Sequence, residues 1–326
     1  MLVVLGGGHS GRRDFCRSLG VADAEQYAVT LADARAFAAE GAACPALSAV
    51  CARMATWRAV IATERGGGII PADAAARADR EANGRLNIAL ASLADCVVLM
   101  TAGIPRVIKG RLGGEARADG QLLVFRHGAT RANMERRYAG GMSDEDLCAE
   151  GREQVARARE RLAGFAAGCA PAVRERLLAP RVVCVSPLRR AVQTAELLYP
   201  QSALRLVEGF REMDFGLFEG RTAGDLLADP ATRAAYQAFV AGGACPPSAS
   251  SPGERVADFR ARTAAAFRDM VRTAEDAAGV TVVVAHGGTQ MALFSQFCPW
   301  HVAGDPYFAW QTDCGGFRLG RVAVGA

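Results

Sequence analysis

Two histidine-glycine pairs follow β-like runs in the second half of the chain. Arg126-His127-Gly128 comes after QLLVF, and His286-Gly287-Gly288 comes after TVVVA. In an open α/β sheet, ligands bind at the carboxyl ends of the strands, so the two histidines are expected to face each other. A single histidine would more often cap a strand or pack in a core, but the glycine after each one allows close backbone approach. The two histidine-glycine pairs therefore predict a ligand-binding or catalytic site at this edge of the sheet.

Arginine residues also lie at the same predicted edge of the sheet. Arg126 precedes the first histidine, and a third β-like run leads into Ser186-Pro187-Leu188-Arg189-Arg190. The planar, permanently charged guanidinium binds phosphate oxygens in bidentate fashion. A neutral imidazole can attack phosphorus and carry it covalently. Two histidines and two arginines around one point therefore indicate phosphoryl transfer, with one histidine as nucleophile and the other stabilising charge.

Four ordered motifs carry a resemblance to a known family. They are RHGAT with Asn133 after it, SPLRRAVQTA, REMDFGLFEG and VVAHGG. Four motifs in this order are far more specific than any one of them. The region resembles the histidine phosphatase superfamily, also called phosphoglycerate mutase-like, and REMDFGLFEGR is similar to the motif of its α-ribazole phosphatases. This resemblance implies a three-layer α/β/α sandwich.

The resemblance also implies a role for each matching residue. His127 would be the phosphorylated nucleophile, and no metal ion or cofactor would be needed. The remaining catalytic and phosphate-binding positions would be Arg126, Thr130, Asn133, Arg189, His286 and Gly287.

Glu212 matches the family's carboxylate, which protonates the leaving oxygen and then activates water. Asp214 and Glu219 are competing carboxylates. Spacing from Phe215-Gly216 favours Glu212, and we interpret Glu219-Gly220 as a structural turn, but Asp214 stays open as the acid. Relatives often carry GGES and DNGS where this chain has SPGER (251–255) and DCGG (313–316), which we interpret as tolerated variation.

The elements that must position these residues alternate between strand-like and helix-like segments, which indicates parallel α/β sheets. Strands are expected at 2–5, 57–63, 96–100, 121–125, 181–186 and 281–285. Helices are expected from about residue 12 and over 72–93, 144–163, 188–198, 222–240 and 254–277. We therefore predict two α/β domains, a truncated P-loop-like domain over 1–112 and a histidine phosphatase domain over 119–326. A stretch rich in glycine and charge, 110–120, would join them.

The first strand runs into GGGHSGRR, which is placed as a phosphate-cradling loop would be. A P-loop needs a lysine for the phosphates and a Ser or Thr hydroxyl for Mg²⁺, but Arg12 and Arg13 stand at those positions. We therefore interpret the loop as a degenerate P-loop. It keeps the glycines Gly6 and Gly11, and it has Arg12 and Arg13 in place of the lysine and the hydroxyl.

With ATERGGGIIP (62–71) and residues 84–110, the loop resembles the adenosylcobinamide kinase and adenosylcobinamide-phosphate guanylyltransferase family. No histidine lies between His9 and His127 to serve as that family's guanylylated residue. We therefore expect no kinase or guanylyltransferase activity, and at most weak nucleotide or corrinoid binding.

Composition excludes several classes of protein. The 326 residues are 51% hydrophobic and 22% charged, which fits a globular chain, and no apolar run is long enough to span a membrane. The net charge of +4 is too small, and the arginines too scattered, to predict nucleic-acid binding. The ten cysteines form no C-x-x-C pair, so zinc has little support and reduced thiols in the cytoplasm are expected.

Three functions remain open from the sequence. The fused first half favours a phosphomonoesterase of cobalamin nucleotide-loop assembly, whose small substrate would be α-ribazole 5′-phosphate or adenosylcobalamin 5′-phosphate. A mutase or broad-specificity sugar-phosphate phosphatase would carry the same catalytic residues. The third reading is a non-catalytic module that binds nucleotide or corrinoid, which suits the first half better than the second.

Overall fold

The structure, a computed structural model, describes residues 1–41, 45, 48–65, 70–110, 121–272, 280–297 and 310–322. These residues form two units, each with its own five-stranded sheet. The first unit falls within Met1–Asp119 and Phe165–Arg174, and the second within Gly120–Gly164, Glu175–Pro299 and Pro306–Ala326. The two predicted α/β folds are confirmed. All but the first residue of the predicted linker at 110–120 lie outside the described residues.

The sheet of the first unit has the order β2-β3-β1-β4-β5. Its strands are β1 (Leu2–Gly6), β2 (Gln26–Ala28), β3 (Ala59–Thr63), β4 (Cys96–Thr101) and β5 (Ile104–Lys109). The first four are parallel, and β5 pairs antiparallel with β4. The valine-rich central strands are buried, as parallel strands covered on both faces require.

In the described part of the first unit, four α-helices cover this sheet, and short capping side chains define the starts of three of them. Thr30, Ser48 and Asp73 each accept a hydrogen bond from the third residue of the helix that follows. The helices are α1 (Arg12–Ser18), α2 (Leu31–Glu40), α3 (Ala49–Met54) and α4 (Ala74–Leu93), with a 3₁₀ turn at Asp23–Glu25.

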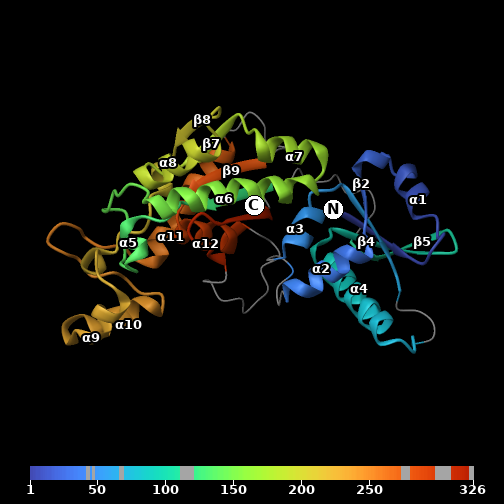
Figure 1. The fold of residues 1–326 in the computed structure, drawn as a ribbon, viewed down its shortest axis with the longest axis horizontal. Helices are drawn as coiled ribbons and strands as arrows, with labels where there is room; N and C mark the ends of the chain where they lie inside the picture. Colours follow the sequence, from blue (N-terminus) through green and yellow to red (C-terminus); the bar gives the residue numbers. More distant parts are fainter. Residues whose placement is uncertain are drawn as a thin grey trace. The chain divides into compact units, whose positions relative to one another are not determined.

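The sheet of the second unit has the order β10-β6-β9-β7-β8. Its strands are β6 (Gln121–Arg126), β7 (Val182–Val185), β8 (Ala203–Leu206), β9 (Val280–Ala285) and β10 (Phe317–Arg321). All are parallel except β10, which runs antiparallel to β6. Strands β7 and β9 lie side by side although they are far apart in the sequence (Figure 1). The carboxyl ends of β6, β9 and β7 therefore share one edge.

Helices make up much of the described chain after β6, and two of them, Ala149–Ala167 and Pro171–Leu178, include residues of the segment Phe165–Arg174 that belongs to the first unit. The 3₁₀ turns of this region lie at Glu208–Phe210 and Gly216–Phe218. Helices α9 and α10 lie apart from the strands β7, β8 and β9 (Figure 1). The α-helices are α5 (Arg131–Met134), α6 (Ala149–Ala167), α7 (Pro171–Leu178), α8 (Arg189–Leu198), α9 (Ala223–Ala228), α10 (Pro230–Val240), α11 (Val256–Arg272) and α12 (Gly287–Phe297). No helix among the described residues is long and apolar enough to cross a membrane.

Two predicted helices differ from the structure. The helix expected over 144–163 begins only at Ala149, because Leu147 bridges to Thr130 and its N–H donates to the Gln193 side chain. The segment expected as one helix over 222–240 is divided at Asp229, whose side chain caps α10 before Pro230. The proline cannot continue α9 but suits the first position of a new helix.

Candidate active site

His127 and His286 come together at the carboxyl edge of the second sheet. His127 follows β6, His286 follows β9, and the His127 N–H donates to the Ala285 carbonyl at 2.9 Å. The ring centroids are 5.1 Å apart with planes inclined at 63°. Both side chains are buried. The predicted convergence of the two histidines is present.

The His127 ring has a defined tautomer. Its Nδ1 lies 2.7 Å from the Gly128 carbonyl oxygen, which can only accept, so Nδ1 carries the proton and Nε2 keeps its lone pair. Burial, followed by the charges of Arg190 and Arg126, holds the pKa of His127 well below its ordinary value of 6.5. A neutral imidazole with a free Nε2 is a nucleophile.

The loop after His127 is packed too tightly for side chains. A Cβ on Gly128 would clash with the Gly151 carbonyl of α6, and a Cβ on Gly151 would clash with Ala129. The Gly128 N–H donates to the Thr194 hydroxyl of α8 at 3.1 Å. The two glycines therefore let α6 press against the loop that carries the nucleophile.

Arg126 and Arg190 place positive charge beside the histidines. Arg126 donates to the Thr312 carbonyl at 2.8 Å. Arg190 is fully buried and donates to the carbonyls of Ser143 at 2.6 Å and Gly140 at 3.1 Å. The charges of both arginines lower the pKa values of both histidines, so all four groups share one electrostatic environment.

The structure does not bring Arg189 into this cluster. Its side chain is 59% exposed and binds Asp146 at 2.9 Å. Arg189 begins α8, and one residue along a helix turns the side chain by about 100°. Arg190 shares the buried face of Ala191 and Ala195, so that apolar spacing was the sequence signal for the inward arginine. The structure therefore places Arg190, rather than the predicted Arg189, beside the histidines.

Glu212 reaches the start of α12, directly after His286. Its carboxylate accepts from the Met213 N–H at 2.9 Å and from the Gly288 N–H at 3.3 Å. A Cβ on Gly288 would clash with this carboxylate. Burial raises the pKa of Glu212, opposed by the Met213 N–H and the charge of Arg190. A carboxyl group with a raised pKa beside two histidines can serve as a proton donor.

The two competing carboxylates, Asp214 and Glu219, accept hydrogen bonds from loop residues. Asp214 accepts from the Gly216 N–H at 2.9 Å and from the Ser251 hydroxyl. Glu219 accepts from the Gly140 N–H at 2.7 Å and the Ser143 hydroxyl at 2.5 Å. The structure therefore gives both side chains an anchoring role in these loops.

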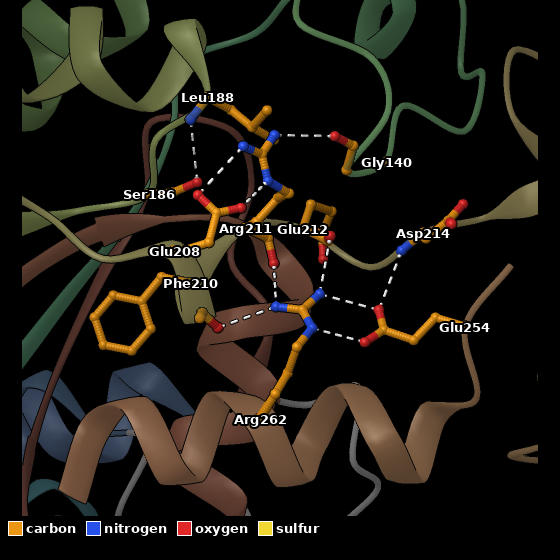
Figure 2. Close-up of polar contacts among 12 residues, drawn as sticks. Gly140, Ser186, Leu188, Glu208, Phe210, Arg211, Glu212, Asp214, Glu254 and Arg262 are labelled. Atoms are coloured by element: carbon orange, nitrogen blue, oxygen red, sulfur yellow. Dashed lines mark hydrogen bonds and ion pairs between the residues drawn. The ribbon is translucent and has the colours of Figure 1, made fainter. Parts of the chain in front are cut away.

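Arg262 of α11 fixes the segment that carries Glu212 (Figure 2). Its guanidinium donates to the carbonyls of Arg211 at 2.8 Å and Glu212 at 3.1 Å, and to both carboxylate oxygens of Glu254 at 2.6 and 3.0 Å. Glu254 in turn accepts from the Asp214 N–H at 3.2 Å. Sequence reasoning missed Arg262, because nothing in the pattern of α11 indicates which carbonyls it faces.

The remaining predicted residues, Thr130, Asn133 and Gly287, lie in the first turns of the helices that follow the two histidines. The Asn133 side chain accepts from the Thr130 N–H at 3.0 Å and from its hydroxyl at 3.2 Å, which closes the first turn of α5. A Cβ on Gly287 would clash with the Gln311 side chain. No group of three or more His, Cys, Asp or Glu residues in the described part of the chain could hold a metal ion.

In the first unit, Arg12 of the GGGHSGRR loop points toward the end of β3. The Arg12 guanidinium donates to the Ala62 carbonyl and to the Thr63 hydroxyl at 3.1 Å, both at the end of β3. Gly11 has φ of 76°, a left-handed conformation that suits glycine. Arg13 is exposed.

Comparison with known families decides the class of the second unit. Residues 122–315 match the histidine phosphatase superfamily, branch 1. The chain belongs to this superfamily. It is a phosphoric monoester hydrolase. Residues 38–108 are similar to a second family, cobinamide kinase / cobinamide phosphate guanyltransferase.

Solved structures resemble this histidine phosphatase over part of its length. An Escherichia coli K-12 protein, provisionally named an alpha-ribazole-5'-P phosphatase, is 23% identical, covering 64% of this chain and 100% of its own, with a TM-score of 0.46. A mycobacterial glucosyl-3-phosphoglycerate phosphatase is 26% identical, covering 61% and 92%, with a TM-score of 0.46. A mycobacterial hydrolase is 26% identical, covering 63% and 84%, with a TM-score of 0.49. A search of the curated proteins found no match.

Proposed function

We propose that the second unit hydrolyses small phosphate monoesters through a phosphohistidine at His127. The observation that carries this proposal is a set of buried nitrogens around that ring. Arg126 Nε, Arg190 Nε and His286 Nδ1 have no hydrogen-bond partner among the described residues. Buried polar atoms are normally paired, so three unpaired nitrogens, two of them guanidinium donors, indicate an anionic, multidentate ligand. A phosphoryl group supplies three acceptor oxygens.

The reaction runs in two balanced steps. His127 Nε2 attacks phosphorus while the P–O bond to the leaving group breaks, and Glu212 donates its proton to the departing oxygen. A water molecule then attacks the phosphohistidine, the P–N bond breaks, and Glu212 takes the proton of that water. The arginines and His286 hold the equatorial oxygens, where negative charge accumulates.

The substrate that we propose is α-ribazole 5′-phosphate or adenosylcobalamin 5′-phosphate. The support is the fused segment 38–108, similar to a family that acts on cobinamide and cobinamide phosphate. A phosphatase joined to such a segment would suit the same pathway, since function follows the site and its context rather than the fold.

We propose that the first unit no longer catalyses. Arg12 and Arg13 replace the lysine and the magnesium ligand of a P-loop, and Arg12 donates to the end of β3. An arginine held in this way has donors committed to the protein rather than to a nucleotide. The unit would then serve as scaffold or weak binding module.

The test is phosphate release without added metal from α-ribazole 5′-phosphate, 3-phosphoglycerate and p-nitrophenyl phosphate. Wild type should prefer the ribazole ester, and His127→Ala should lose activity on all three. His9→Ala, which changes a histidine of the first unit, is the matched control and should behave as wild type. Equal weak activity on all three esters would contradict the cobalamin assignment, and an active His127→Ala variant would contradict the nucleophile.

A further inference from the structure

Ser186 contacts His286 at Nε2, whereas the ring nitrogen that has no partner in the described structure is Nδ1. Ser186 follows β7, is fully buried, and its N–H donates to the Val284 carbonyl of β9 at 3.0 Å. Its Oγ lies 2.7 Å from His286 Nε2. The backbone pairing of β7 with β9 therefore sets the distance between this hydroxyl and the imidazole.

The hydroxyl also has a donor facing it. The Leu188 N–H donates to Ser186 Oγ at 3.4 Å, a long hydrogen bond at the turn into α8 (Figure 2). A serine hydroxyl has one proton to give and two lone pairs to accept with. With Leu188 on one lone pair, Ser186 keeps its proton to donate to His286 Nε2 and a second lone pair with which to accept from it, so Leu188 alone does not set the direction.

The opposite arrangement leaves more groups unsatisfied. If Nε2 carried the proton and donated to Ser186, the serine proton would have no acceptor among the described residues. The lone pair on His286 Nδ1 would also stay unpaired, since Nδ1 has no partner in the described structure. Buried unpaired polar groups are costly, so the first arrangement is favoured. It leaves a single unmatched group, an N–H on Nδ1.

The tautomer of His286 matters because the lowered pKa of its imidazole favours the neutral form. Burial, followed by the charges of Arg190, His127, Arg126 and Arg262, holds the pKa of His286 well below 6.5. A protonated imidazole donates from both nitrogens, but a neutral one donates from only one. The tautomer therefore decides whether Nδ1 offers a proton or a lone pair to an anion.

We propose that Ser186 is a positioning residue that fixes His286 as the Nδ1–H tautomer, so that Nδ1 donates to a phosphoryl oxygen. This inference rests on the proposed function of the same site. Ser186 does not touch the substrate and acts only through His286. In the other tautomer, Nδ1 would present its lone pair to phosphoryl oxygens and repel them.

The first test reads the tautomer directly, by long-range ¹H–¹⁵N correlation spectroscopy of the full-length, histidine-labelled protein without substrate. The four histidines are assigned with single variants. His286 should carry its proton on Nδ1 in wild type and in Ser186→Thr, which retains the hydroxyl. Ser186→Ala should shift His286 to a mixture or to Nε2–H. An Nε2–H signal for His286 in wild type would overturn the proposal even if no serine variant folds.

The second test connects the tautomer to turnover of p-nitrophenyl phosphate and inhibition by orthovanadate. Ser186→Ala should lower kcat by about tenfold to a hundredfold, which is at or below the factor of about 10²–10³ typical for the loss of one hydrogen-bond donor. It should also weaken inhibition by orthovanadate. Ser186→Thr should recover most of both. A Ser186→Ala variant with unchanged tautomer and kcat would overturn the inference. An inactive wild type with Nδ1–H on His286 would instead contradict the proposed function and leave the tautomer assignment standing.

Discussion

At the scale of single residues, two adjacent arginines should differ sharply. Arg190→Ala removes a buried guanidinium beside both histidines, and we expect kcat/KM to fall by about 10²–10³. Arg189→Ala removes an exposed side chain paired with Asp146 and should change kcat/KM by less than about twofold. Steady-state kinetics of both variants show which of the two arginines contributes to turnover. A larger effect from Arg189 would restore the original prediction.

Because Arg190 also holds loop carbonyls, the variant needs a folding control. Arg190→Lys keeps the charge but not the planar fork, and should recover stability more than turnover. Thermal unfolding followed by circular dichroism separates the two effects. If activity fell only in proportion to the folded fraction, Arg190 would have a purely structural role.

The two titrating groups should give a bell-shaped pH profile of kcat/KM. His127 must be unprotonated, and since its pKa is lowered well below 6.5, activity should rise with pH and level off below that value. Glu212 must be protonated, and since its pKa is raised above 4.5, activity should fall as pH rises through this higher value. Glu212→Gln should remove the falling limb.

The Glu212 assignment also has a leaving-group signature. An alkyl phosphate needs the proton, whereas p-nitrophenolate leaves without one. Glu212→Gln should therefore slow alkyl esters by about 10²–10⁴ and affect the rapid first turnover of p-nitrophenyl phosphate much less. Asp214→Asn, measured in parallel, is the control. An equal leaving-group dependence in that variant would give the acid role to Asp214.

At the scale of elements, Arg262 links α11 to the Glu212 segment through carbonyls and Glu254. Arg262→Gln should lower the free energy of unfolding by about 1–3 kcal/mol, because acceptors of a charged donor lose their partner. It should also slow alkyl esters more than p-nitrophenyl phosphate, since Glu212 loses its position. Arg268→Gln, on the same helix but exposed, is the matched control. Equal losses on both esters would show that Arg262 only stabilises the fold.

The elements also show how far a sequence can predict this site. The buried valine and leucine runs of β6 and β9 predicted the strand ends that carry His127 and His286. The short strand β8 and the edge strand β10 were missed, because few buried residues mark them. Ser186 and Arg262 were missed for another reason. Their partners lie on other elements, and hydrogen bonds across a fold leave no periodic trace in either segment.

At the scale of the whole molecule, the first unit should not respond to nucleotide. Without a magnesium ligand in its loop, Mg²⁺-GTP at millimolar concentration should not raise the melting temperature measurably, and no GTP-dependent phosphorylation of cobinamide should occur. Differential scanning fluorimetry and a radiolabelled transfer assay measure both. The double variant Arg12→Lys/Arg13→Ser restores the P-loop residues and serves as comparison. Cobinamide phosphorylation by wild type would contradict the loss of activity.

The pairing of β6 with β9 has a consequence for synthesis of the chain. His127 follows β6, and His286 follows β9, which comes more than 150 residues later in the sequence. Contacts this distant in sequence form late, after a large loop has closed. A nascent or prematurely terminated chain that lacks β9 therefore has His127 but no phosphatase site. If both histidines are needed, as proposed above, hydrolysis requires the finished β6–β9 pair.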